Sequence, residues 1–427
     1  MRSVTTIRLL ALAILIGACS AVSDRLPYTT TFTTVGDTVI AATTGDVSDS
    51  LARTLAIDWR ASDSTTQAIG DVSQIAIGHD GEVWIWDGAT PALWRLDSDG
   101  TSLKRISRKG SGPGEYVRAN SIAVLRDGGL VMWDDGNMRV NFYNADGTHR
   151  STASVAFSDC CGLTVMVDVQ NRIWLMAHPL MIGSKDKPMT PEQFGNPQQI
   201  GYFRFDSTGK LLDTIMSPLL PGRDNNVSAI HASATGIGGM ATNVPHGAYQ
   251  REDPSPLGHI VTSLTRPYAV NAEANGKHVR ITREFTPPPV SSDERSQLRA
   301  NIEVRMKNVK ADFTWNGPEI PNDKAPIEDI SVALDGRIWV RIAAPSEPFE
   351  PDPPQSRGNA PAPPPVKFRA KDKRWDVFEP DGTYLGRVIV PRSISVYAMR
   401  GENAWGVVRD ENDLAVVVRM HISPSLR

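Results

Sequence analysis

The chain has 427 residues, of which 40% are hydrophobic and 22% are charged, and its formal net charge is −3. This composition is ordinary for a folded domain and excludes a chain that is disordered throughout. The charge balance shows no basic surplus, so we expect no nucleic-acid partner.

The amino terminus has the pattern of an export signal. Arg2 and Arg8 accompany an apolar run, residues 9–16, which is too short to span a bilayer but long enough for the core of a signal peptide. A plain secretory signal is one interpretation of this pattern.

The end of this run favours a second interpretation. The residues Ile16-Gly17-Ala18-Cys19 resemble the bacterial lipobox, in which the Cys is acylated and becomes the first residue of the mature chain. The resemblance implies a signal peptide over residues 1–18, lipidation of Cys19 and a tether over residues 19–28. The protein would then be anchored in the cell envelope, and Ser20 after the Cys favours the outer membrane.

Four stretches of the chain repeat one pattern, in which short apolar or β-branched runs are separated by turns with Gly or Asn. They are residues 75–106, 122–147, 165–215 and 330–390. Runs of this kind joined by Asp-Gly turns are typical of antiparallel strands in tight hairpins. Each stretch therefore predicts a four-stranded meander, and their repetition indicates a β-propeller.

Two more units are less regular. One covers residues 260–285, with an unclear first strand near residues 238–243, and the last has only three runs between residues 394 and 421. The Thr-rich hairpin at residues 29–42 is spare, so we expect this N-terminal segment to complete the last blade and hide its edge. The fold class predicted for residues 29–427 is all-β, a six-bladed β-propeller of four-stranded antiparallel blades.

The second unit also resembles the NHL repeat of six-bladed propellers. The residues that carry the resemblance are Gly110-Ser-Gly112-Pro-Gly114-Glu115-Tyr116, Asp127-Gly128, Trp133-Asp134, Asn137 and Arg139. The Gly-x-Gly-Pro-Gly-Glu variant is similar to that of six-bladed propeller lipoproteins of bacteria. In such repeats the Asp, Asn and Arg mostly hydrogen-bond the backbone within and between blades, which is the role the resemblance implies for Asp134, Asn137 and Arg139.

The long connections of the predicted ring all fall on one face, and the tight turns fall on the other. We expect recognition on the face with long connections, because binding residues concentrate in loops on a rigid scaffold. The predicted ligand-binding patch, chosen by this topology and by its mixed polarity, comprises Arg108, Lys109, Glu115, Tyr116, Arg118 and Asn120.

Two insertions on that face have a character of their own. Apolar residues at helical spacing predict a helix over residues 293–311, with Ser292 as its N-cap, which either covers a pocket or packs between blades. Residues 345–365 hold nine prolines and predict an extended loop, either a solvated spacer or a partner motif.

The adjacent cysteines Cys160 and Cys161 allow two states. An oxidising compartment permits a vicinal disulfide, but two packed thiols avoid the strain of closing a ring between neighbours. The tryptophans in the second strands of the units, among them Trp84, Trp174 and Trp339, are predicted core residues between blades.

No spacing in the sequence matches a metal-binding or nucleophile motif, so we expect no metal or other cofactor and no catalytic residue. The favoured function is a non-catalytic binding or scaffold module with an unknown protein or small-molecule ligand. The alternative is a lactonase-like or lyase propeller enzyme with a divalent cation such as calcium in the channel. Its nearest supply of oxygen ligands is Glu115, Asn120, Asp134, Asp135 and Asn137.

Overall fold

The structure is a computed structural model that describes residues 27–45, 47–155, 164–177, 200–223, 225–233, 236–352 and 360–426. The predicted signal peptide, Cys19, Cys160 and Cys161 lie outside these residues. Lipidation and the vicinal disulfide therefore stay predictions.

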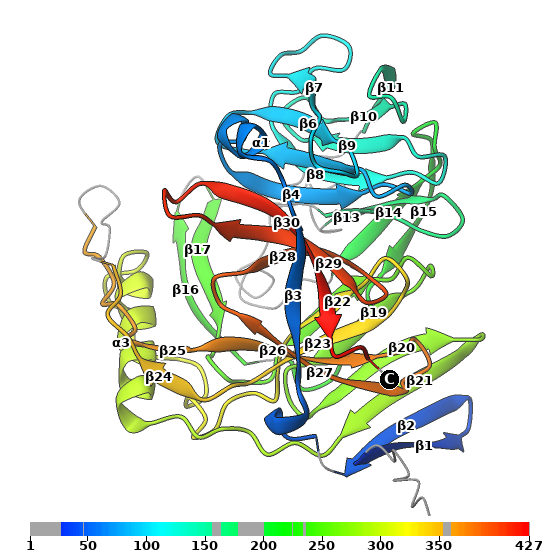
Figure 1. The fold of residues 1–427 in the computed structure, drawn as a ribbon. Coiled ribbons are helices and arrows are strands. Elements are labelled where there is room, and N and C mark those ends of the chain that lie inside the picture. The colour runs from blue at the N-terminus through cyan, green and yellow to red at the C-terminus, as the bar shows by residue number, and fades with distance from the viewer. Residues whose placement is uncertain are drawn as a thin grey trace, which may run out of the picture.

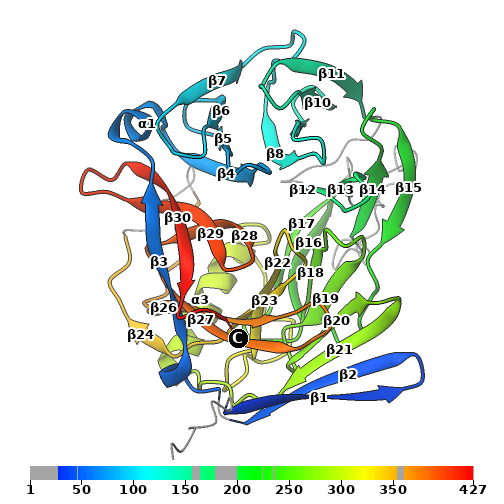
Figure 2. The same ribbon diagram turned by 45° about the vertical axis from the view of Figure 1, so that its right-hand side comes forward.

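Six four-stranded blades stand around one axis, as Figure 2 shows. Three of them are separate sheets whose strands pair in chain order. The first contains β4 (Val72–Ile77), β5 (Val83–Asp87), β6 (Ala92–Leu96) and β7 (Leu103–Arg108). The second contains β8 (Ala119–Val124), β9 (Leu130–Asp134), β10 (Arg139–Tyr143) and β11 (His149–Ser154). The third contains β12 (Val165–Val167), β13 (Ile173–Ala177), β14 (Gly201–Phe205) and β15 (Leu211–Met216).

The other three blades belong to larger sheets. Blade 4 contains β18 (Gln250–Pro254), β19 (Ile260–Leu264), β20 (Ala269–Ala274) and β21 (Lys277–Arg283). Blade 5 contains β22 (Ile327–Val332), β23 (Ile338–Ile342), β26 (Asp372–Phe378) and β27 (Tyr384–Pro391). Blade 6 contains β28 (Ser395–Arg400), β29 (Asn403–Arg409), β30 (Ala415–Ser423) and β3 (Arg53–Arg60). The first strand of every blade is the innermost, so six strand ends meet at each mouth of the channel (Figure 2).

An N-terminal strand closes the last blade, but it is not the strand predicted from the Thr-rich hairpin. The strand β3 pairs antiparallel with β30 and parallel with β27, and so joins blades 5 and 6. The hairpin forms β1 (Tyr28–Val35) and β2 (Thr38–Gly45), and β2 pairs parallel with β21 of blade 4. Most of β1 is exposed, whereas Leu55 of β3 is buried between blades, which explains why the apolar β3 takes the place in the ring.

The blades follow from the turn chemistry and the tryptophans. Gly128, in the turn between β8 and β9, has a φ of +83°, which a residue with a Cβ rarely adopts, and Gly81 and Gly336 take the same conformation in blades 1 and 5. Trp84, Trp174 and Trp339 lie in second strands and are at most 2% exposed, so they pack in the core as predicted.

A 3-10 helix, η1 (Asp49–Leu51), and a short α-helix, α1 (Asp63–Ala68), flank β3. Among the described residues no helix combines the length and the apolar character needed to cross a membrane.

The β1–β2 hairpin lies beside β21 at the bottom of Figure 1. Other elements outside the ring gather on one side of it, at the left of Figure 1. They are the hairpin of β16 (Asn226–Ser233) and β17 (Gly236–Asn243), the helix α3 (Ser292–Lys307), and the pair β24 (Ser346–Pro348) and β25 (Phe368–Ala370). The segment at residues 238–243 was predicted as the first strand of blade 4. It belongs to the outer hairpin instead, and β18 takes the inner place.

The inserted helix exists, with different bounds and contacts from those predicted. Its N-cap is Ser291, whose side chain accepts a hydrogen bond from the Glu294 N–H, and not Ser292. Ile302 and Met306 are buried in one cluster with residues of the β16–β17 hairpin, so the helix packs against this hairpin and not between two blades. Its side chains also hold the end of the Pro-rich insertion, because Asn301 and Asn308 donate to the carbonyls of Pro364 and Pro361, at 2.7 and 2.9 Å. This end of the predicted spacer is therefore fixed to α3.

Candidate functional site

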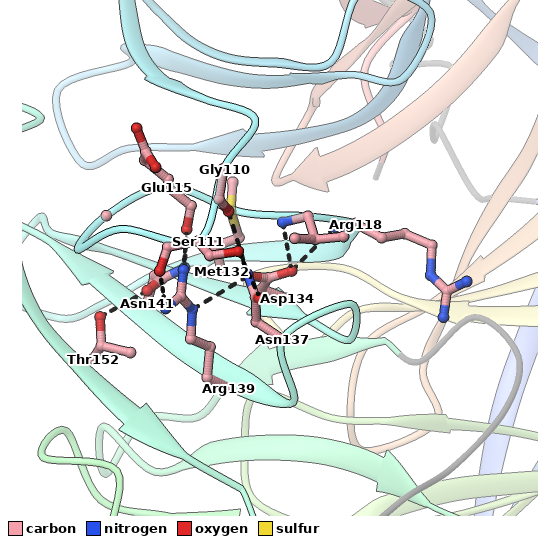
Figure 3. A network of polar contacts seen from close by, with 12 residues as sticks. Gly110, Ser111, Glu115, Arg118, Met132, Asp134, Asn137, Arg139, Asn141 and Thr152 are labelled. Carbon is pink, nitrogen blue, oxygen red and sulfur yellow. Dashed lines mark hydrogen bonds and ion pairs between the residues drawn. The ribbon is translucent and has the colours of Figure 1, made fainter.

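The Gly-rich segment between β7 and β8 is held by one buried carboxylate. Asp134, at the end of β9, is fully buried and accepts hydrogen bonds from the backbone N–H groups of Val117 and Arg118, each at 3.1 Å. The side chains of Asn137 and Arg139 donate to its other oxygen, at 2.6 and 3.3 Å (Figure 3). These contacts tie the segment to blade 2, in the backbone-binding role that the NHL resemblance implies.

Blade 1 repeats this arrangement at Asp87, at the end of β5. Its carboxylate accepts from the backbone N–H groups of Gly70, Asp71 and Thr90 at 2.8 to 3.1 Å. Burial by itself would raise the pKa of Asp87, but the hydrogen bonds from Thr90, Gly70 and Asp71 outweigh it and lower the pKa. A carboxylate at this position is a structural part of the repeat, because it fixes the connection that enters the blade.

The six residues of the predicted ligand-binding patch do not form one surface. Arg108 and Glu115 form an ion pair of 2.8 Å and line a groove of about 410 Å³ at the outer rim, between β7 and β11. Arg118 and Asn120 bind Asp135 instead, each at 2.6 Å. In Figure 3 the side chains of Glu115 and Arg118 point to opposite sides of the segment.

Tyr116 is the one member of the patch that the structure excludes. It is completely buried and packs edge to face on Trp86, with ring centroids 4.8 Å apart. A ligand on the surface cannot reach it, so its inclusion was wrong. Lys109 is exposed, and its backbone forms an isolated bridge with Tyr116.

The carboxylates and amides considered as metal ligands are engaged with protein groups. Asp134 binds four donors, Asp135 binds Arg118 and Asn120, and Glu115 binds Arg108 and the Gly112 N–H. None of these acids lines the channel cavity. Among the described residues, no group of three or more His, Cys, Asp or Glu side chains is placed to hold a metal ion.

The channel contains a cavity of about 270 Å³. Its walls come from the first strands of all six blades and from the turns that follow them. Most of the lining is apolar, with Ala76, Val124, Met166 and Leu334 as examples. A concave apolar site with few polar groups is the usual form of a small-molecule site.

The turns at one mouth of the cavity supply three basic residues from neighbouring blades. His79 follows β4, Arg126 follows β8, and Arg400 ends β28. Arg400 reaches from blade 6 to blade 1, where it donates to the carbonyls of Ile77 and Gly78 at 3.4 and 3.3 Å.

The other two basic residues are also held by backbone carbonyls. Arg126 Nε donates to the carbonyl of Asp168 at 3.2 Å, and His79 Nε2 lies 3.2 Å from the carbonyl of Leu125. Neither Arg126 nor Arg400 forms an ion pair with any carboxylate in the described part of the chain. Both guanidinium groups are therefore oriented by backbone carbonyls, and neither pairs with a carboxylate among the described residues.

Asp253 of blade 4 lines the same cavity, on the side of the ring opposite blade 1. Its Oδ2 accepts a hydrogen bond of 2.7 Å from the Val332 N–H of blade 5. Burial raises the pKa of Asp253 to about 7. The hydrogen bond from Val332 lowers this pKa, whereas the negative charges of Asp329 and Glu252 raise it further. Near neutral pH the carboxyl is thus present in both its protonated and its ionised form.

None of these cavity residues was predicted as a site residue. They are single polar residues in separate turns, and no spacing connects them. The usable signal was their register: Arg126, Arg400 and His79 stand at or just beyond the end of a first strand, and such ends converge on the axis of a ring.

Comparison with known proteins agrees with the six blades. A family model described as a 6-bladed beta-propeller matches residues 61–179. The protein is a six-bladed β-propeller. No curated protein matches the chain at a significant level.

Solved structures similar to this propeller have low sequence identity. A Bacteroides fragilis protein provisionally named as exported is 12% identical, with a TM-score of 0.44, over 89% of this chain and 98% of that one. A gluconolactonase of Xanthomonas campestris is 12% identical, with a TM-score of 0.36, over 87% and 98%. A virginiamycin B lyase of Staphylococcus aureus is 11% identical, with a TM-score of 0.38, over 85% and 97%. Such similarity concerns the fold alone and carries no information about activity.

Proposed function

We propose that this propeller is a lipid-anchored module of the cell envelope that binds a small-molecule ligand in its channel without transforming it. The observation that carries the proposal is the cavity of about 270 Å³, whose mouth presents the guanidinium groups of Arg126 and Arg400, neither of which forms an ion pair with a described carboxylate. Arg126 is exposed and Arg400 is half-buried, so both guanidinium groups are accessible to a ligand that carries a negative charge.

Filling the cavity tests this proposal. Ser331 lines the cavity, and Ser331→Phe places a large side chain there, while Ser102→Phe adds the same group on an exposed turn. We expect the purified protein and the Ser102→Phe variant to retain a small molecule from an envelope extract, detected by native mass spectrometry. Ser331→Phe should retain none. Equal retention by all three proteins, or none by the unaltered protein, would contradict channel binding.

The anchor rests on the lipobox resemblance at Cys19 and has its own test. In cells fed radiolabelled palmitate we expect the full chain to take up label and to sediment with outer membranes. Cys19→Ala should lose both properties, and label on Cys19→Ala would refute acylation at this residue.

A protein partner at the Gly-rich segment between β7 and β8 is the second part of the proposal. Arg108, Lys109 and Arg118 at the two ends of this segment are exposed, as such a contact requires. If their combined replacement by Gln leaves the proteins recovered with the propeller unchanged, the segment is not a partner surface.

The raised pKa of Asp253 favours one second candidate, an acid–base enzyme that uses the same cavity. The described lining residues do not fit the divalent cation of the predicted alternative. They supply one carboxylate, whereas the guanidinium groups of Arg126 and Arg400 repel a cation. Metal analysis checks this: we expect no stoichiometric calcium or zinc and no effect of a chelator on the melting temperature. Consumption of the retained molecule by the protein, abolished by Asp253→Asn, would favour the enzyme over the binding module.

A further inference from the structure

The charge of the channel cavity differs in sign from that of the whole chain. The protein has a formal net charge of −3. Among the described residues the charged groups lining the cavity are Arg126, Arg400, Asp253 and, when protonated, His79. The two guanidinium groups outweigh the single carboxylate even when Asp253 is ionised, so the described lining is positive.

The two guanidinium groups keep donors available for a ligand. The Arg126 side chain uses Nε for the Asp168 carbonyl and forms no other hydrogen bond with the described residues, while its backbone N–H donates to Asn171 Oδ1. Arg400 uses one N–H on each terminal nitrogen for Ile77 and Gly78. Arg carries five N–H donors, so both side chains retain several that no described group accepts.

The two arginines lie near enough to affect each other. Burial lowers the pKa of Arg400, and the positive charge of Arg126 lowers it further, against the opposing effects of Asp335 and Glu82. These two acids do not line the cavity. Asp335 accepts from the Gly401 N–H and Glu82 from the Asp80 N–H, at 2.8 and 3.2 Å. An anion between the arginines would relieve this repulsion and gain charge-assisted hydrogen bonds.

The rest of the lining shows that the ligand is more than a bare ion. A cavity of about 270 Å³ has room for about nine water molecules at roughly 30 Å³ each, enough for a small organic molecule. Ala76, Val124 and Met166 offer it apolar contact, and Asp253 on the opposite wall can accept a hydrogen bond from a hydroxyl group.

We infer that the channel recognises a small hydroxylated organic molecule with one anionic group, which Arg126 and Arg400 bind while a hydroxyl of the ligand bonds Asp253. This inference rests on the proposed channel-binding function and names its ligand class. A carboxylate and a phosphate share the required chemistry, since both accept two parallel N–H bonds from Arg.

Matched sugars test the inference by isothermal titration calorimetry at constant ionic strength. The probes are glucuronate, glucose 6-phosphate and uncharged glucose, which separate the two anionic groups from the neutral body. We expect at least one anionic sugar to bind at least tenfold more tightly than glucose. Glucose binding as tightly as both anions, or no binding of either anion at millimolar concentration, would overturn the inference.

Variants then test whether Arg126 and Arg400 bind the anionic group of the sugar. The double replacement Arg126→Gln and Arg400→Gln should weaken the anionic sugar at least tenfold and leave glucose unchanged. Arg392→Gln, in an exposed turn away from the cavity lining, is the matched control and should bind like the unaltered protein. The double replacement by Lys keeps both charges and should retain part of the affinity. Unchanged binding in the Gln double variant, with the fold verified by circular dichroism, would refute the assignment.

The two proposals fail in different ways. If an extract molecule is retained and lost in Ser331→Phe, yet proves neutral, the channel binds a ligand and only the inferred ligand class is wrong. If nothing is retained, the channel function itself fails.

Discussion

Replacing Asp253 by Asn should stabilise the protein, with a pH dependence of definite sign. The structure raises the pKa of this carboxyl from 3.8 to about 7, chiefly because the channel walls bury it. A rise of about 3 units corresponds to about 4 kcal/mol, since one unit is about 1.36 kcal/mol of difference between the two protonation states. Asn keeps an oxygen that can accept the Val332 N–H bond, so the replacement removes the charge and little else.

The sign follows from the order of the two pKa values. Below about pH 4 the carboxyl is protonated in both the folded and the unfolded chain, so its titration does not change the free energy of unfolding. As the pH rises to about 7, the unfolded chain ionises and the folded chain does not, so the free energy of unfolding of the unaltered protein falls. Above about pH 7 the carboxyl is ionised in both states, and the free energy of unfolding falls no further through this group. Asp253 is only half-buried, so solvent screens part of its charge, and we expect about 2 to 4 kcal/mol of relative stabilisation in Asp253→Asn at alkaline pH.

Urea unfolding at about pH 5 and pH 8, followed by tryptophan fluorescence, measures the difference in the free energy of unfolding between Asp253→Asn and the unaltered protein. The control is Asp206→Asn, on an exposed turn where the Thr208 hydroxyl lowers the pKa of the carboxyl. The pH dependence of this control has the opposite sign, because the unaltered protein gains stability relative to Asp206→Asn as the pH rises through the acid range. A gap between Asp253→Asn and the unaltered protein that stays constant or shrinks with rising pH would refute the reasoning.

Three other outcomes follow from the packing and the ring closure. Trp339→Ala empties a site that is 2% exposed and should cost about 3 to 5 kcal/mol in urea unfolding; a loss under about 1 kcal/mol would mean that the blades repack. Asp134→Asn weakens the buried hydrogen bonds that hold the Gly-rich segment and should cost about 1 to 3 kcal/mol, with faster proteolytic cleavage near residue 112 as the local sign. Deletion of the chain through residue 45 should leave cooperative thermal unfolding intact, whereas deletion through residue 60 removes β3 and should abolish it. Equal behaviour of the two deletions would contradict closure by β3.

The difference between β3 and the Thr-rich hairpin shows where sequence reasoning reached its limit. Both segments have strand patterns, and the alternation of Leu55, Ile57 and Trp59 was a readable sign of a buried face. The sequence favours the hairpin because it is the strand pair left over once the six units are assigned. Local turn chemistry identifies a hairpin, but it does not say which distant strand will accept it as a neighbour.

The candidate site shows the same limit more strongly. Asp134 could be assigned its role, because its partners lie within about one repeat of it and the repeat is visible in the sequence. Arg126 and Arg400 are separated by most of the chain, and they become a candidate site only because the fold brings both to one mouth, where neither pairs with a described carboxylate.

By itself, the sequence determined the number of blades, the tight turns and the tryptophans of the core. These depend on residues within one hairpin or one repeat, where backbone preference and the alternation of buried side chains are local properties. Tertiary structure alone decided which strand closes the ring, what α3 packs against and which side chains share the channel. Each of these depends on contacts between segments far apart in the chain, whose energy arises only when the ring is closed.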